Sequence, residues 1–185
     1  METRIIIAGS GGQGVLFLGK LMAHSAMLEG KEVTWFPSYG AEMRGGTANC
    51  TVIISDEMIG SPVTRNPHLL VALNEASYRR FADRLLEDGL LLYDSSLVAI
   101  REHRDDIRAI GIPASGMAAS SKHTKSANMA MMGAVSSAAR LLKLASVLKA
   151  LDETTPSRRK DSLAVNKDLI TKGYEFIENK KSDHR

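Results

Sequence analysis

The first part of the chain alternates short apolar runs with segments of helical periodicity. Residues 4–8 form an apolar run that ends at glycines, the pattern of a buried strand. Residues 15–28 carry apolar side chains at helical spacing and precede Gly30, a common helix stop. Residues 32–36 are β-branched and aromatic and predict a second strand. Together they predict a strand–helix–strand unit with parallel strands and a right-handed crossover.

Four further strands are predicted downstream, at 49–54, 69–73, 90–93 and 107–112. A turn at Ser55–Glu57 leads into Met58–Ile59 and predicts a hairpin, so the sheet is expected to be mixed. Asn74 is the expected N-cap of a helix that runs to about Glu87. These strands and helices alternate as in an α/β protein.

The last third of the chain is predicted to be helical. One long segment runs from about His123 to Leu151 and is nearly apolar all round between Ala127 and Val135, and a final helix runs from about Leu163 to Asn179. The polar stretch 154–161 between them predicts a flexible loop. The expected fold is a single three-layer α/β domain over residues 1–185. Its sheet is mostly parallel with an antiparallel hairpin, and a glycine-rich loop follows the first strand.

Composition narrows the function classes. Of 185 residues, 44% are apolar and 24% charged, and the small net charge of +3 is spread along the chain, which argues against nucleic-acid and membrane partners. No apolar run is long enough to cross a bilayer and no signal peptide precedes the first strand, so a cytoplasmic location is expected. A single cysteine, Cys50, cannot hold an iron–sulfur cluster, and the histidines lack metal-ligand spacing.

The glycine-rich loop is the strongest chemical signal. Gly9, Gly11 and Gly14 satisfy G-x-G-x-x-G between a strand and a helix, where backbone N–H groups and the positive helix end can approach a phosphate. An ordinary dinucleotide site also needs an acid after the second strand, and residues 34–38 supply none. Three interpretations stay open: a dinucleotide site, a tight turn that binds nothing, and an anion site shared across a subunit boundary.

Three motifs in order resemble the gamma subunit, or gamma domain, of 2-oxoacid:ferredoxin oxidoreductases. They are the stretches 7–15, 37–46 and 125–134, and Asn166 and Gly173–Tyr174 also fit. The resemblance implies an enzyme that oxidatively decarboxylates a pyruvate-, 2-oxoglutarate-, ketoisovalerate- or indolepyruvate-type 2-oxoacid to an acyl-coenzyme A. It implies thiamine diphosphate and iron–sulfur clusters on partner subunits, and coenzyme A shared with this chain.

The expected partners are the alpha and beta subunits, with a delta subunit as a further candidate, and ferredoxin for the whole complex. The chain carries no thiamine diphosphate motif, so the isolated chain is predicted to be inactive and to hold no cofactor alone. Self-association of the isolated chain stays an open alternative. So do a free-standing nucleotide- or dinucleotide-binding module and a purely structural scaffold.

The candidate binding residues come from two loops, with no catalytic and no metal-binding residue expected. Arg44 suits an anion because its planar fork donates two parallel hydrogen bonds, and Tyr39 could stack on an adenine or a partner. The full set is Gly9, Ser10, Gly11, Gly12, Gln13, Gly14, Tyr39, Gly40, Glu42, Arg44 and Gly45.

A subunit interface is expected at the apolar helix. A helix that is apolar all round must be buried on all sides, and in a small domain a partner could supply that burial. The residues expected at this interface are Asn128, Met129, Met131 and Met132.

Overall fold

The computed structural model describes residues 1–38, 47–100, 104–156 and 161–182. Its strands are β1 (Glu2–Ser10), β2 (Glu32–Ser38), β3 (Thr47–Ser55), β4 (Leu69–Ala72), β5 (Leu90–Asp94) and β6 (Arg108–Ile112). Its α-helices are α1 (Val15–Leu28), α2 (Glu75–Phe81), α3 (Ala114–Ser120), α4 (Ala127–Ala139), α5 (Leu144–Thr154) and α6 (Leu163–Ser182). Two short 3-10 helices are η2 (Ala82–Arg84) and η3 (Thr124–Ser126).

The described strands form one six-stranded sheet in the order β2-β3-β1-β4-β5-β6. The pairs β1/β4, β4/β5 and β5/β6 are parallel, whereas β3 runs antiparallel to both of its neighbours. Every strand except β3 therefore points the same way. Their carboxyl ends, with the amino end of β3, share one edge of the sheet.

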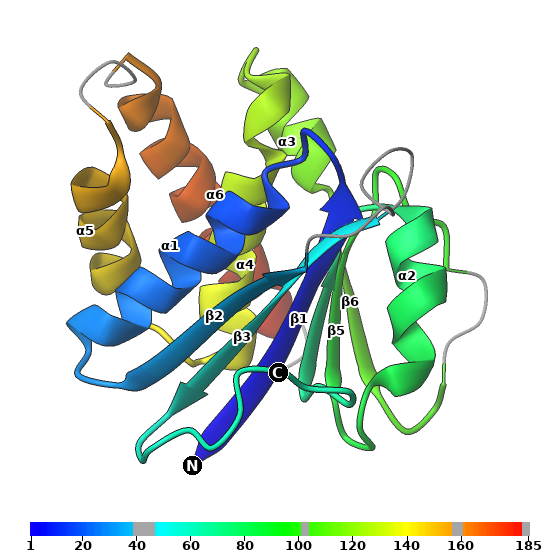
Figure 1. Ribbon diagram of the computed structural model, residues 1–185. Coiled ribbons are helices and arrows are strands. Elements are labelled where there is room, and N and C mark those ends of the chain that lie inside the picture. The colour runs from blue at the N-terminus through cyan, green and yellow to red at the C-terminus, as the bar shows by residue number, and fades with distance from the viewer. Residues whose placement is uncertain (39–46, 101–103, 157–160, 183–185) are drawn as a thin grey trace.

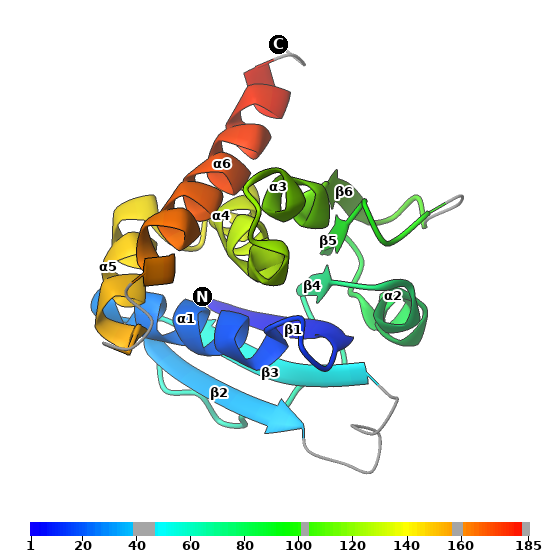
Figure 2. The same ribbon diagram turned by 90° about the horizontal axis from the view of Figure 1, so that it is seen from above.

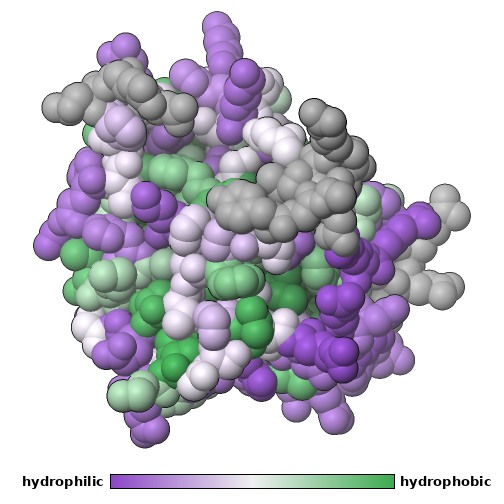
Figure 3. Space-filling view, in the orientation of Figure 1, coloured by the Kyte–Doolittle hydropathy of each residue, from purple (hydrophilic) through white to green (hydrophobic). Residues whose placement is uncertain are grey.

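The sheet separates two helical layers (Figures 1 and 2). Helices α1, α3, α4, α5 and α6 cover one face, and α2 lies on the other. The larger apolar core lies under the five helices, and a smaller one under α2 includes Ile6, Leu70 and Phe81. Apolar side chains gather on the face shown in Figure 3. Phe36 and Val63 are exposed and line one small cavity. This arrangement confirms the predicted three-layer α/β domain.

Helices α4 and α6 cross at very short range. A Cβ added at Gly133 would lie 1.8 Å from the Ile170 carbonyl oxygen, and one at Gly173 would lie 1.9 Å from that of Ala130. Only glycine has no side chain to separate the two backbones here. The close crossing seats α4 between the sheet, α1 and α6.

Helix α4 is the central helix of the domain, which corrects the expected subunit interface. Met129, Met131 and Met132 are at most 1% exposed and Asn128 is 6% exposed, and the methionines belong to the main core. Other elements of the same domain supply the burial that a helix apolar all round requires. These four residues therefore offer almost no surface to a partner.

The βαβ prediction is right about strand direction and wrong about adjacency. Strand β3 lies between β1 and β2 and is antiparallel to both, so β1 and β2 are parallel without being paired. The hairpin expected at 55–59 is absent because Met58 and Ile59 are not in a strand. The antiparallel pairs are instead β2/β3 and β3/β1.

Local helix chemistry explains the other differences. The segment expected to be one helix from His123 to Leu151 is divided at Arg140, whose φ of 54° ends α4 in the left-handed region. Asn74 caps α2 as expected, accepting a hydrogen bond from the Ser77 N–H, but that helix ends at Phe81.

Within the predicted loop 154–161, residues 157–160 lie outside the described residues. No described helix is long and apolar enough to span a membrane.

Candidate functional site

The glycine loop follows β1, next to the end of β4. The connections that leave these two neighbouring strands lead to opposite sides of the sheet. After β1 the chain continues through α1 to β2, on one side of β1; after β4 it continues through α2 to β5, on the other side. Open α/β sheets bind ligands at such a switch point, beyond the carboxyl ends of the strands. The fold therefore places Gly9–Gly14 where a ligand site is expected.

The side chain of Gln13 holds the loop in shape. Its amide oxygen accepts a hydrogen bond from the Ser10 N–H at 2.7 Å, and its amide nitrogen donates to the Leu73 carbonyl at 2.9 Å. Asn74 donates to Ser10 Oγ and to the same Gln13 oxygen. Gln13 thus ties the end of β1 to the end of β4, which gives its side chain a positioning role.

Two glycines adopt backbone conformations that favour glycine. Gly12 has φ of 89° and Gly14 has φ of 72°, both in the left-handed region. A Cβ on Gly14 would also lie 2.3 Å from the amide nitrogen of Asn128, which donates to the Gly14 carbonyl at 3.3 Å. Asn128 therefore fastens the loop to α4, and this contact within the domain satisfies a buried polar side chain.

The start of α1 faces the loop without a capping side chain. Gly14 is the N-cap and makes no side-chain cap hydrogen bond, and no acid occupies the first turn of α1. The first N–H groups of a helix have no intrahelical acceptor and carry a partial positive charge. A Cβ on Gly11 would meet nothing within 4 Å, so open space adjoins the loop. The loop can accept an anion at this point.

A cavity of about 120 Å³ lies beside this loop. Its walls come from the ends of β1, β4 and β5, the start of α3, η3 and the first residue of α4; they are Gly12, Gln13, Leu73, Asp94, Ser115, Thr124, Lys125 and Ala127. Pockets for whole drug-sized ligands usually measure roughly 300–1,000 Å³. This cavity suits a single phosphate-sized group, so a larger ligand would have to extend out of it.

Lys125 and Asp94 supply the charges at the cavity. Lys125 is exposed on η3, where its ammonium can meet an anion. Asp94 is 1% exposed and accepts hydrogen bonds from the Ser115 N–H, the Ser115 hydroxyl at 2.6 Å and the Ser96 N–H. The buried carboxylate is thus satisfied by donors that hold the start of α3. The amino-acid sequence alone does not bring Lys125 and Asp94 together, because their meeting depends on the strand order.

The candidate binding residues of the second loop, Tyr39, Gly40, Glu42, Arg44 and Gly45, lie outside the described residues. The described residues on either side of them, Ser38 and Thr47, end β2 and begin β3. Thr47 is the register partner of Ser10. Both anchors of the second loop therefore belong to the sheet edge that carries the glycine loop.

The strand order argues against an ordinary dinucleotide site. In that site an acid at the end of the neighbouring parallel strand holds a ribose. Here antiparallel β3 separates β1 from β2, and β2 ends in Phe36, Pro37 and Ser38.

The described residues also contain no group of three or more His, Cys, Asp or Glu side chains that could hold a metal ion. Burial raises the pKa of the Cys50 thiol to about 12, so it is not a reactive thiolate.

Comparisons with known proteins agree with this architecture. The family model "Pyruvate ferredoxin/flavodoxin oxidoreductase" matches residues 4–176. The 2-oxoglutarate synthase subunit KorC of Methanocaldococcus jannaschii is 33% identical, with 95% of this chain and 94% of that protein covered. The ketoisovalerate oxidoreductase subunit VorA of Methanothermobacter thermautotrophicus is 44% identical over 71% of this chain, and the match covers 27% of that longer protein.

Two solved structures share the fold over 96% of this chain. The gamma subunit of a keto/oxoacid ferredoxin oxidoreductase from Geobacter sulfurreducens is 26% identical, with a TM-score of 0.82 and 99% of its length covered. The 2-oxoglutarate:ferredoxin oxidoreductase from Magnetococcus marinus, with 2-oxoglutarate, coenzyme A and succinyl-CoA bound, is 25% identical, with a TM-score of 0.86 over 31% of its chain. This chain belongs to the pyruvate ferredoxin/flavodoxin oxidoreductase family.

Proposed function

We propose that this chain is the gamma-type subunit of a multi-subunit 2-oxoacid:ferredoxin oxidoreductase. This proposal is supported by the match to the 2-oxoglutarate synthase subunit KorC over 94% of that protein and to the Geobacter sulfurreducens gamma subunit over 99% of that chain. Alpha and beta subunits, with delta as a further candidate, would hold thiamine diphosphate and the iron–sulfur clusters. Ferredoxin would accept the electrons, and the assembly would be cytoplasmic.

We further propose that the cavity at the glycine loop takes a phosphate group of coenzyme A. The observation that carries this proposal is that Lys125 and the loop residues Gly12 and Gln13, which precede the uncapped start of α1, line one cavity of about 120 Å³. Both features favour an anion. The cavity is large enough for one phosphate group but too small for a nucleotide. The rest of the coenzyme would lie outside it, against Tyr39, Arg44 and partner subunits.

The chain would contribute one wall of the coenzyme A cleft and no catalytic group. Burial raises the pKa of the Cys50 thiol to about 12, so this thiol is not available as a reactive thiolate. The names of its relatives differ in the 2-oxoacid: ketoisovalerate for VorA, 2-oxoglutarate for KorC and pyruvate for PorC. Choice of the 2-oxoacid would therefore rest with other subunits.

Purification of the tagged chain from its source cell tests its membership of a complex. We expect co-purifying chains that contain a thiamine diphosphate motif, ferredoxin-reducing activity in the complex, and none in the isolated chain. Titration of the isolated chain with NAD, FAD or ATP tests the alternative. Tight binding of any of these would favour a free-standing nucleotide-binding module, and partners without a thiamine diphosphate motif would contradict the proposal.

A substitution at Gly11 tests the coenzyme A contact. A Cβ at Gly11 meets nothing within 4 Å and its φ is not positive, so Gly11→Val should leave the fold intact while covering the loop amides. In the assembled enzyme we expect a raised KM for coenzyme A and an unchanged KM for the 2-oxoacid. Gly60→Val, also in open space and far from the loop in sequence, is the matched control. If the Gly11→Val enzyme has the same KM for coenzyme A as the parent, the coenzyme A contact is contradicted. The loop would then be only a turn in a scaffold subunit.

A further inference from the structure

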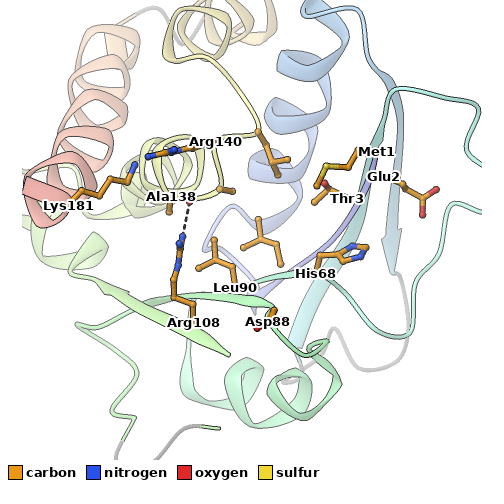
Figure 4. A pocket seen from close by; sticks show the side chains of 13 residues that line it. Met1, Glu2, Thr3, His68, Asp88, Leu90, Arg108, Ala138, Arg140 and Lys181 are labelled. Carbon is orange, nitrogen blue, oxygen red and sulfur yellow. Dashed lines mark hydrogen bonds between the residues drawn. The ribbon is translucent and has the colours of Figure 1, made fainter. Parts of the chain in front are cut away.

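A large cavity lies away from the glycine loop, beside the amino ends of the parallel strands. Its volume is about 650 Å³, and Arg108, Arg140 and Lys181 line one side of it (Figure 4). A second cavity of about 590 Å³ runs along β6 and α6 and shares Arg108 and Lys181 with the first. The two cavities are therefore adjacent, and together they are here called the β6 groove.

The β6 groove borders an open sheet edge. Strand β6 ends the strand order and pairs only with β5 among the described strands. The Arg108 N–H donates to Gly89, and the Ile112 carbonyl accepts from Ser95, so alternate residues from 108 to 112 bond toward β5. In a parallel ladder the residues between them point the other way. Ala109 and Gly111 therefore present their backbone groups to the groove, and the Lys180 ammonium lies 3.5 Å from the Gly111 carbonyl.

The walls of the groove along β6 are apolar. Tyr93, Ala109, Ile110 and Gly111 line it from the sheet, and Ile177 lines it from α6. A Cβ on Gly111 would lie 2.9 Å from the Tyr93 ring, so glycine there lets the ring pack against the edge strand. Side-chain pockets beside unpaired edge N–H and C=O groups are the features by which sheets accept an added strand.

Positive charge surrounds the groove. Arg108 donates to the Ala138 carbonyl at 2.9 Å, and Lys181 donates to the Ser137 carbonyl at 3.0 Å and pairs with Glu178. These two bonds satisfy carbonyls at the end of α4 and fix both cations. Arg140 and Lys181 point toward each other in Figure 4. With Lys180, four cations from β6, the C-cap of α4 and α6 line the groove, and Glu2 and Asp88 lie on its far side.

We propose that an extended, acidic segment of a neighbouring subunit of the same enzyme adds to the sheet as a strand beside β6. Its backbone pairs with Ala109 and Gly111, its apolar side chains lie against Tyr93 and Ile177, and its carboxylates face the four cations. A second copy of this chain is a poor occupant. Two-fold pairing of β6 edges would bring the cations of both copies together, and like charges repel.

A proline at position 109 tests the backbone pairing. Ala109→Pro removes an N–H that β5 does not use, and edge strands tolerate proline at such positions. The assay is binding of the purified chain to the remaining subunits of its enzyme, with thermal unfolding as the check on folding. We expect a fold close to that of the parent and an affinity at least tenfold weaker. A folded Ala109→Pro variant that binds as tightly as the parent overturns the proposal.

A charge reversal tests the acidic partner independently. Lys180→Glu should weaken the same binding several-fold and flatten its dependence on salt, because it removes an attractive charge. Lys172→Glu makes the same change on α6, at an exposed residue that pairs with Asp168 and does not line the groove, and should bind as the parent does. Equal binding by both variants would contradict an acidic occupant.

The proposal rests on the proposed function, and the outcomes separate the two. If the parent chain binds no subunits of an oxidoreductase, the proposed function fails. If the parent binds them and neither Ala109→Pro nor Lys180→Glu weakens the complex, only the β6 inference fails. Concentration-dependent dimers of the isolated chain that Ala109→Pro abolishes would make a second copy the occupant, against the proposal.

Discussion

Gly133→Ala should destabilise the domain far more than its size suggests. In an exposed helix interior this change is favourable by roughly 0.5–1 kcal/mol, because alanine is the better helix former. Here the new Cβ would lie 1.8 Å from the Ile170 carbonyl oxygen, on the backbone of α6. A rotamer change cannot relieve a clash with a backbone, so the two helices must move apart.

The magnitude follows from that geometry. Ordinary contact begins at 3.4 Å, so α4 and α6 must separate by about 1.6 Å at their crossing. A gap of 0.5–1 Å already forfeits about a quarter to a half of each dispersion contact, and Met129, Leu169 and Ile170 pack in this core. Overpacking usually costs about 1–3 kcal/mol, occasionally more. We expect a net loss of about 3 kcal/mol, or roughly 6–12 °C in Tm for a domain of this size.

Urea and thermal unfolding, followed by circular dichroism, measure this loss. Gly116→Ala is the matched control, since it is the same change inside helix α3, where the nearest atom would lie 3.4 Å away. The control should change stability by less than about 1 kcal/mol. A Gly133→Ala variant as stable as the parent would refute the close-crossing argument, because no small adjustment accommodates a Cβ against a backbone carbonyl.

Three other predictions concern single side chains. Gln13→Ala should cost about 1–3 kcal/mol in urea unfolding, since it leaves the Ser10 N–H and the Leu73 carbonyl without their partner; an unchanged midpoint would contradict the tie between β1 and β4. Cys50, whose burial raises its pKa to about 12, should resist a thiol reagent at pH 8 until urea unfolds the chain, and rapid labelling of the native chain would count against this. The hydrogen bond from Lys31 lowers the pKa of Asp56 from 3.8 to about 2, so its stabilising contribution is present above about pH 4 and is lost as the pH falls toward 2. A carboxyl NMR titration should give a midpoint near 2 in the parent and a higher one in Lys31→Gln, and equal midpoints would refute the pairing.

The sequence pattern was sufficient for most elements of the fold but not for their order. Apolar runs and helical spacing located β1, α1, β4 and β5 because each follows from local patterning. Insertion of β3 between β1 and β2 depends on long-range pairing that no local pattern encodes. The division of the expected long helix at Arg140 was missed because a non-glycine residue ends α4 in the left-handed region. Gly133 lies in the third sequence motif, and its contact with the Ile170 carbonyl explains why a residue without a side chain is needed there.

The candidate site was partly predictable for the same reason. The glycine motif follows a strand pattern and precedes a helix pattern in the sequence, so Gly9–Gly14 could be assigned directly. Lys125, Asp94 and Ser115 come from separate segments and meet only because β1, β4, β5 and β6 end at one edge. The apolar stretch of α4 led to the wrong prediction of a subunit interface. An apolar pattern shows that a helix is buried, but it does not show whether the same domain or a partner covers it.

The coenzyme A kinetics of a Lys125→Gln enzyme test the central claim most directly. Loss of a charged hydrogen bond to a phosphate costs about 1.5–3 kcal/mol, which is tenfold or more in binding. Lys122→Gln, a neighbouring exposed lysine that does not line the cavity, is the control. In the assembled enzyme we predict a KM for coenzyme A at least tenfold higher for Lys125→Gln alone, with the KM for the 2-oxoacid unchanged. A KM for coenzyme A equal to that of the parent would contradict a phosphate site at the glycine loop.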